Sequence, residues 1–137
     1  MAREETTTRH RILIVDDEES TRLLFARMLS KDLRAEVQLA GTSVQALRLA
    51  ESYVYDAILL DLMMPGMDGY ELLRRIREAT PNGATPVVVV SILSDEKSAQ
   101  RARELGANAY HVKPVRRAEL VATVKNQLAA RRRAGAR

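Results

Sequence analysis

The sequence predicts a doubly wound α/β fold, with five parallel strands in one sheet and helices on both of its faces. Short apolar runs and stretches with helical spacing alternate five times along the 137 residues, and such βα repeats form parallel sheets through right-handed crossovers. One run, residues 36–40, alternates polar and apolar side chains, which is typical of an edge strand. This pattern favours the strand order 2-1-3-4-5, in which the order reverses between strands 1 and 3.

Hydrophobic periodicity places the elements in the first half of the chain. Residues 11–15 are an apolar run followed by acids, which indicates a buried strand, and residues 20–30 carry apolar side chains at helical spacing. After the alternating strand, Thr42 and Gln45 have the spacing of a capping box, which begins the second helix. Residues 56–60 form the third predicted strand.

The same alternation continues in the second half. Asp68 and Glu71 form a cap-like pair that begins the third helix. Residues 86–90 are a continuous β-branched run, as expected of a central strand that is covered on both faces. Ser94 or Asp95 is the expected cap of the fourth helix. The remaining predictions are a fifth strand over residues 108–112 and helices over residues 42–50, 68–78, 95–105 and 116–130.

Composition restricts the class of protein. With 46% hydrophobic and 29% charged residues, the chain is typical of a globular domain rather than a disordered one. It contains no cysteine, so disulfides and thiolate metal sites are excluded. The longest apolar runs are far shorter than the roughly 18 residues that a membrane span needs, and the first ten residues lack the apolar stretch of a signal peptide. We therefore expect a soluble cytoplasmic protein, with a flexible segment over residues 1–10, one domain over residues 11–130 and a basic tail or linker stub over residues 131–137.

The net charge of +4 originates in the C-terminal segment. Residues 116–137 hold seven of the 22 Lys and Arg residues but only one of the 18 Asp and Glu residues. A basic helix and tail permit contact with nucleic acid or an anionic membrane, although no aromatic side chains interleave with the basic ones to stack on bases. A solvated helix face with a frayed end is the simpler interpretation. We expect neither partner for this domain, and nucleic-acid binding by the tail remains an alternative.

Polar side chains follow four of the five predicted strands. Asp16 and Asp17 follow the first strand, Asp61 the third, Ser91 the fourth and Lys113 the fifth. The carboxyl ends of parallel strands meet at one edge, where such sheets bind ligands. Carboxylates that converge there repel one another unless a cation intervenes, and oxygen-only ligands point to Mg²⁺ or a similar hard ion. Singly, each residue could be a helix cap or an ion-pair partner, but together they favour a carboxylate that forms an acyl phosphate.

The chain resembles the receiver domain of bacterial response regulators, the CheY-like phosphoacceptor half of two-component signalling. The matching stretches are ILIVDDEE, DAILLDLMMPGMDGYELLRRIR, PVVVVSI and GANAYHVKPV, which extend over about residues 11–128. The resemblance implies a flavodoxin-like fold and a phosphorelay switch that is phosphorylated by a histidine kinase or a phosphotransfer protein. The signal would change the face of the fourth helix, fifth strand and fifth helix, which controls a downstream protein, an output domain or homodimerisation.

The resemblance also assigns the residues that hold the metal and the phosphoryl group. It implies that Asp61 is the phosphoacceptor. Asp16, Asp17, Asp61 and the backbone carbonyl of Met63 are the implied ligands of Mg²⁺, for which Mn²⁺ could substitute. Lys113 is the implied contact of the phosphoryl group. The domain would partly catalyse its own phosphorylation and dephosphorylation, so we expect a switch rather than a turnover enzyme.

Two further residues are implied to transmit the signal. By resemblance, Ser91 is the switch hydroxyl and Tyr110 is the switch aromatic, which turns inward when Ser91 moves towards the phosphate. The peptide bond between Lys113 and Pro114 is usually cis in the family, and such a bond is accessible only before proline.

The chain departs from the family pattern at two positions. Ile92 stands where the family has a small residue, which predicts restricted access to the phosphorylated carboxylate and slower turnover. Val115 stands where the family often has phenylalanine, with a loss of apolar area but not of chemistry. A phosphohydrolase that passes through an aspartyl phosphate is an alternative, but such enzymes need a second aspartate two residues after the nucleophile, where this chain has Met63. A degenerate receiver that only binds a partner is disfavoured because all five site residues are present.

Overall fold

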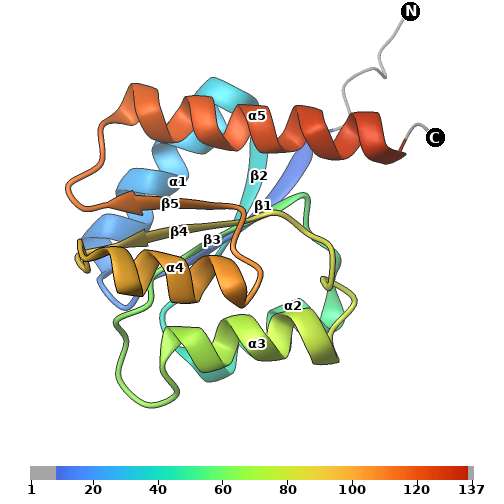
Figure 1. Ribbon diagram of the computed structural model, residues 1–137. Coiled ribbons are helices and arrows are strands. Elements are labelled where there is room, and N and C mark those ends of the chain that lie inside the picture. The colour runs from blue at the N-terminus through green and yellow to red at the C-terminus, as the bar shows by residue number, and fades with distance from the viewer. Residues whose placement is uncertain (1–8, 136–137) are drawn as a thin grey trace, which may run out of the picture.

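The computed structural model describes residues 9–135 and arranges them as one sheet between two layers of helices (Figure 1). Strands and helices alternate throughout these residues. The strands are β1 (His10–Val15), β2 (Ala35–Ala40), β3 (Ala57–Leu60), β4 (Val87–Ser91) and β5 (Ala109–Val112). The helices are α1 (Glu19–Leu33), α2 (Ser43–Ser52), α3 (Gly69–Ala79), α4 (Glu96–Glu104) and α5 (Arg117–Gly135).

The sheet has the predicted topology. Its strands are all parallel and follow the order β2-β1-β3-β4-β5. The alternating strand β2 lies at one edge, as its mixed polarity predicts, and β5 lies at the other. The order reverses between the neighbouring strands β1 and β3, so the carboxyl ends of these two strands flank the switch point where ligands bind in doubly wound sheets.

The two faces of the sheet lead into two separate hydrophobic cores. Side chains that alternate along one strand point to opposite faces, so Val87 and Val89 pack in one core and Val88 and Val90 in the other. Helices α2, α3 and α4 cover the first core, while α1 and α5 cover the second (Figure 1). Coverage on both faces explains why β4 is a continuous apolar run.

Side-chain caps begin three of the helices where the sequence predicts them. The Oγ1 atom of Thr42 accepts the backbone N–H of Gln45 at 3.1 Å, which begins α2. Asp68 and Asp95 accept the N–H three residues further on at 2.9 and 3.0 Å, which begins α3 and α4. Of the two residues that could cap the fourth helix, Asp95 therefore does so rather than Ser94. These bonds satisfy amide groups that have no partner inside the helix.

Helix α5 extends beyond its predicted end. The sequence predicted a helix to residue 130 and a frayed tail, whereas the helix continues to Gly135. Arg131 fastens this extension, because its guanidinium donates to the carbonyl of Tyr55 and lies 3.8 Å from the Asp56 carboxylate. The predicted flexible segment falls mainly on residues 1–8, outside the described residues, and His10 already belongs to β1. Although α5 is 19 residues long, no helix within residues 9–135 is long and apolar enough to cross a membrane.

Candidate functional site

Three carboxylates meet at the carboxyl ends of β1 and β3. Asp16 and Asp17 follow β1, Asp61 follows β3, and one carboxylate oxygen from each lies within 4.8 Å of the others. The backbone of both loops continues the sheet, since the N–H of Asp61 donates to the carbonyl of Val15 at 2.9 Å. The side chains of Asp16 and Asp61 are almost fully buried, whereas Asp17 is exposed. The sheet thus brings the three predicted acids together at its switch point.

Lys113 adds a positive charge from the end of β5. Its Nζ atom lies 2.8 Å from Oδ2 of Asp16 and 3.4 Å from Oδ2 of Asp61. Burial acts to lower the pKa of Lys113, but the hydrogen bond to Asp16 and the charge of Asp61 outweigh it, so the pKa is raised. Lys113 is therefore a cation at neutral pH. The following bond, Lys113–Pro114, is cis, as the resemblance implied.

Burial and the contacts of Asp61 act in opposite directions on the pKa of its carboxyl group. Burial raises the pKa of its carboxyl group because a charge is poorly solvated away from water. The N–H of Met63, which donates to Oδ1 at 3.0 Å, and the charge of Lys113 lower this pKa, while the charge of Asp16 raises it. The net pKa of Asp61 is above its ordinary value. Asp61 is thus a carboxylate that gains from a further positive neighbour.

The donor set fits a hard divalent cation. Three carboxylates face one another, and Lys113 neutralises only one of their charges. Oδ1 of Asp16 and Oδ1 of Asp61 each accept one backbone N–H, from Glu18 and Met63, which fixes the orientation of both groups. Carboxylate oxygens with room for water are the ligands that Mg²⁺ selects. The triad is therefore consistent with a Mg²⁺ site.

A cavity of about 340 Å³ opens over the acidic triad. Its lining consists of Asp16, Asp17, Glu18, Asp61, Met63, Ile92 and Lys113. The two apolar members, Met63 and Ile92, are 49% and 62% exposed, so they stand at the mouth rather than in the floor. No role was predicted for Glu18 from the sequence, although its position directly after the Asp pair could have placed it in the cavity lining. The cavity has the size to admit a phosphoryl group beside Asp61.

Ser91 and Tyr110 converge on one residue of the loop between β4 and α4. Ser91 is fully buried at the end of β4, and its Oγ accepts the N–H of Leu93 at 3.1 Å. Tyr110 on β5 donates its hydroxyl to the carbonyl of Leu93 at 2.7 Å. Burial raises the pKa of Tyr110, so the phenol is a neutral donor. The two predicted switch residues thus contact the same loop residue.

Comparison with known proteins agrees with this fold and site. The chain matches the response regulator receiver domain family over residues 12–125. It is 38% identical over 119 residues to the transcriptional regulatory protein ResD of Bacillus subtilis, covering 87% of this chain and 48% of ResD. It is 37% identical over 119 residues to the cyclic di-GMP phosphodiesterase response regulator RpfG of Xanthomonas campestris, covering 85% of this chain and 31% of RpfG.

A solved structure extends the comparison to the metal site. The receiver domain of the sensor histidine kinase PA1611 from Pseudomonas aeruginosa superposes with a TM-score of 0.79 at 31% identity, covering 89% of this chain and 99% of that domain. In that structure a magnesium ion is coordinated in the active-site cleft.

The fold and the acidic pocket define a phosphoacceptor signalling module rather than a classical enzyme. More particularly, the chain belongs to the response regulator receiver domain family, whose CheY-like members act in two-component systems. The chain spans about half of ResD and about a third of RpfG. The activities of those whole proteins therefore cannot be assigned to this chain from the match.

Proposed function

We propose that this domain is a phosphorelay switch in which Asp61 accepts a phosphoryl group from a histidine kinase or a phosphotransfer protein. The observation that carries the proposal is a nearly buried carboxylate that lies beside two other acids and 3.4 Å from Lys113. An oxygen of Asp61 attacks phosphorus, the P–N bond to the donor imidazole breaks, and the imidazole nitrogen keeps the electron pair. The product is an acyl phosphate, and its hydrolysis returns the carboxylate and inorganic phosphate.

The residues around Asp61 have two separate roles, which are to hold a metal ion and to contact the phosphoryl group. In this proposal Asp16, Asp17, Asp61 and the Met63 carbonyl hold Mg²⁺, and Mn²⁺ is able to substitute. When bound, the ion supplies positive charge that offsets the charge of the phosphoryl oxygens. Lys113 leaves its contact with the free Asp61 carboxylate and pairs with a phosphoryl oxygen instead. The catalytic contribution of the domain to its own phosphorylation and dephosphorylation is limited to this positioning and charge.

Ser91 and Tyr110 report the charge to the surface. The Ser91 side chain rotates so that its hydroxyl donates to a phosphoryl oxygen, and this rotation moves its Oγ away from the N–H of Leu93, from which it accepts at 3.1 Å. Because Tyr110 binds the Leu93 carbonyl, the aromatic ring follows the loop. The face formed by α4, β5 and α5 changes as a result, and that face binds a downstream protein, an output domain or a second copy. A phosphohydrolase would need an aspartate two residues after Asp61 as its acid and base, and this chain has Met63 there.

Beryllofluoride, which mimics a phosphoryl group on a carboxylate, tests the proposal in the presence of Mg²⁺. We expect calorimetric titration to show binding to the wild type, no binding to Asp61→Asn, and at least about tenfold weaker Mg²⁺ binding to Asp17→Asn, which loses one charged ligand. Glu51→Gln, an exposed change on α2, is the matched control and should behave as the wild type. Binding that persists in Asp61→Asn would contradict the assignment of the phosphoacceptor.

A further inference from the structure

Helix α4 is anchored differently from its neighbour α3. Of the nine residues of α4, the buried ones are Ala99 and Ala102, whereas α3 buries Leu72, Leu73 and Ile76. An alanine removes much less apolar surface from water than a leucine or isoleucine does. Apolar packing therefore contributes less to holding α4 in place than it does for α3, and polar contacts contribute correspondingly more.

Two tyrosine hydroxyls hold the segment that leads from the site into α4. Tyr110 binds the carbonyl of Leu93 at 2.7 Å, and Tyr70 of α3 binds the carbonyl of Ser98, in the first turn of α4, at 3.2 Å. The guanidinium of Arg101, one turn further along α4, lies 3.9 Å from the centroid of the Tyr70 ring. A cation over an aromatic face is attracted to it. Tyr70 thus contacts α4 through both its hydroxyl and its ring.

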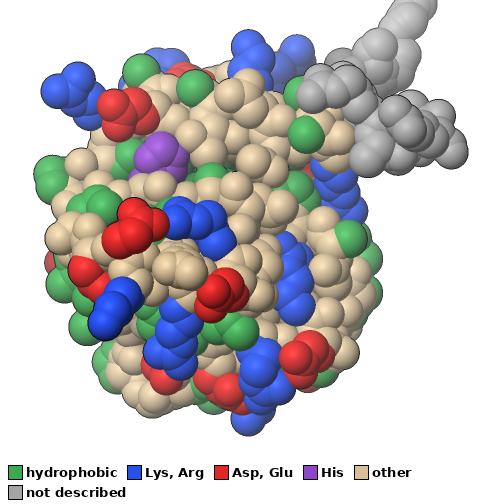
Figure 2. All heavy atoms as spheres, viewed as in Figure 1, with side chains coloured by type: hydrophobic (Ala, Val, Ile, Leu, Met, Phe, Trp, Pro, Cys, Tyr) green, Lys and Arg blue, Asp and Glu red, His purple; other side chains and the backbone are tan. Residues whose placement is uncertain are grey.

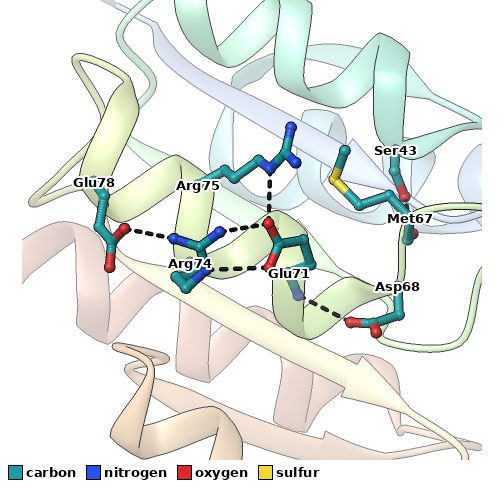
Figure 3. Close-up of polar contacts among 7 residues, drawn as sticks. All are labelled: Ser43, Met67, Asp68, Glu71, Arg74, Arg75 and Glu78. Carbon is teal, nitrogen blue, oxygen red and sulfur yellow. Dashed lines mark hydrogen bonds and ion pairs between the residues drawn. The ribbon is translucent and has the colours of Figure 1, made fainter.

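Polar contacts surround the turn of α3 that carries Tyr70 (Figure 3). Asp68 accepts the N–H of Glu71 at 2.9 Å, and the Glu71 carboxylate binds two arginines of the following turn. The hydroxyl of Ser43 in α2 donates to the carbonyl of Met67 at 2.6 Å, just before α3. These bonds, with the buried side chains of α3, fix the turn that carries Tyr70. Tyr70 therefore lies on the helix that buries the larger apolar side chains, and its contacts join α4 to that helix.

We propose that Tyr70, stacked under Arg101, is a positioning residue that holds α4 in the unphosphorylated arrangement and so sets how readily the domain switches. The inference rests on the proposed function. When the Ser91 hydroxyl turns to the phosphoryl group, the N–H of Leu93 is released, and the displacement passes along residues 92–95 into α4. Helix α4 follows only when Ser98 and Arg101 leave Tyr70. The contact opposes the switch, so its loss favours the phosphoryl-bound arrangement.

Tyr70→Phe removes the hydroxyl and keeps the ring. We expect beryllofluoride in Mg²⁺ to bind Tyr70→Phe roughly two- to tenfold more tightly than the wild type, the factor that one side-chain hydrogen bond is worth. Arg101→Ala should tighten binding as well, and Arg101→Lys, which keeps the charge but loses the planar stack, should fall between Arg101→Ala and the wild type. Tyr53→Phe is the matched control, because Tyr53 is an exposed tyrosine outside the α3–α4 contact.

The sign of the change separates positioning from a merely structural role. A residue that only stabilised the fold would, when truncated, lower the melting temperature and leave the affinity for beryllofluoride unchanged or weaker. An affinity of Tyr70→Phe for beryllofluoride that equals that of the wild type, or is weaker, overturns the proposal. Tighter binding combined with an unchanged or lower melting temperature supports it.

Hydrogen exchange of the unliganded protein supplies a readout that does not depend on Asp61 chemistry. We expect amides of residues 96–104 to exchange faster in Tyr70→Phe than in the wild type, while residues 69–79 of α3 stay unchanged. Failure of the wild type to bind beryllofluoride would sink the proposed function, yet the exchange experiment would still decide whether Tyr70 restrains α4. Identical exchange of α4 in both proteins overturns the restraint.

Discussion

In the proposed function Asp61 meets two opposing requirements, because it must be ionised to attack phosphorus although its side chain is nearly buried. Burial raises its pKa because it disfavours the charged carboxylate. The N–H of Met63 and the charge of Lys113 stabilise the carboxylate and offset part of this free-energy cost. A further cation beside the three acids would relieve the remaining cost. A site that is destabilised when empty and satisfied when loaded is prepared for its ligand, at the expense of the stability of the free domain.

Replacing Asp61 with asparagine should therefore stabilise the metal-free protein. A carboxyl group whose folded pKa lies above its unfolded value weakens folding where it is ionised, and that penalty disappears as the pH falls through the folded pKa. At neutral pH in a chelator, we expect Asp61→Asn to melt about 2–5 °C higher than the wild type. The difference should shrink in acid. Thermal unfolding by circular dichroism measures it, and a lower melting temperature for Asp61→Asn at pH 7 would show that Lys113 overcompensates for burial.

Ile92 at the mouth of the cavity should control the lifetime of the phosphorylated state. Its side chain is 62% exposed and lines the cavity above Asp61, a position from which, in the proposed function, it would screen the acyl phosphate from water. We expect Ile92→Ala to dephosphorylate severalfold faster, with stability within about 0.5 kcal/mol of the wild type because the site is exposed. A time course of intact mass after removal of the phosphodonor measures the rate. An unchanged rate would remove the screening role.

At the scale of the elements, the hydrophobic pattern determines most of what was predictable. The strand order follows from the one alternating strand, β2, and from βα connections that are right-handed. The caps at Thr42, Asp68 and Asp95 follow from local spacing. The far end of α5 did not follow, because the charged residues after 130 indicate a tail while Arg131 is fixed by Tyr55, which lies 76 positions earlier.

The sequence also did not predict the roles of two polar residues whose contacts join distant elements. Arg77 lies on α3, where a charged side chain is usually solvated, yet its guanidinium donates to the carbonyls of Thr85 and Gly106 at 2.6 and 2.7 Å. Burial lowers its pKa, and the ring of carbonyls compensates for the lost water. The contact of Tyr70 with Ser98 likewise joins residues 28 positions apart. Periodicity places such residues on a helix but does not identify their partners.

The ion pairs on the outer face of α3 predict a pH-dependent contribution to stability (Figure 3). Hydrogen bonds from Arg74, and then from Arg75, lower the pKa of Glu71 from 4.5 to about 2. Because the folded pKa is depressed, this contribution is complete above the unfolded pKa and is lost as the pH falls from about 4.5 through about 2. The stability difference between wild type and Glu71→Gln should vanish over that interval in denaturant titrations. High salt should reduce it, since the carboxylate is exposed. A difference that does not vary with pH would contradict the ion-pair origin.

At the scale of the whole molecule, the acidic site and the side on which α4 and α5 lie are connected through one loop. The space-filling view shows acidic and basic side chains interspersed over the side on which α4 and α5 lie, rather than one continuous basic patch (Figure 2). The site lies at the carboxyl ends of the interior strands β1 and β3, and α4 is joined to it through the short loop after Ser91. In the proposed function, a change of charge at Asp61 would pass along this loop to a surface on which a partner distinguishes two states.

Incubation with acetyl phosphate and Mg²⁺, followed by intact-mass measurement, tests the phosphoacceptor assignment most directly. The oxygen of Asp61 displaces acetate as the P–O bond breaks, so we expect the wild type to gain the mass of one phosphoryl group. Asp61→Ala should gain none, Lys113→Ala should gain it more slowly, and a chelator should abolish the gain in the wild type. No phosphoryl gain in the wild type, or an equal gain in Asp61→Ala, would contradict the assignment of Asp61 as the residue that receives the signal.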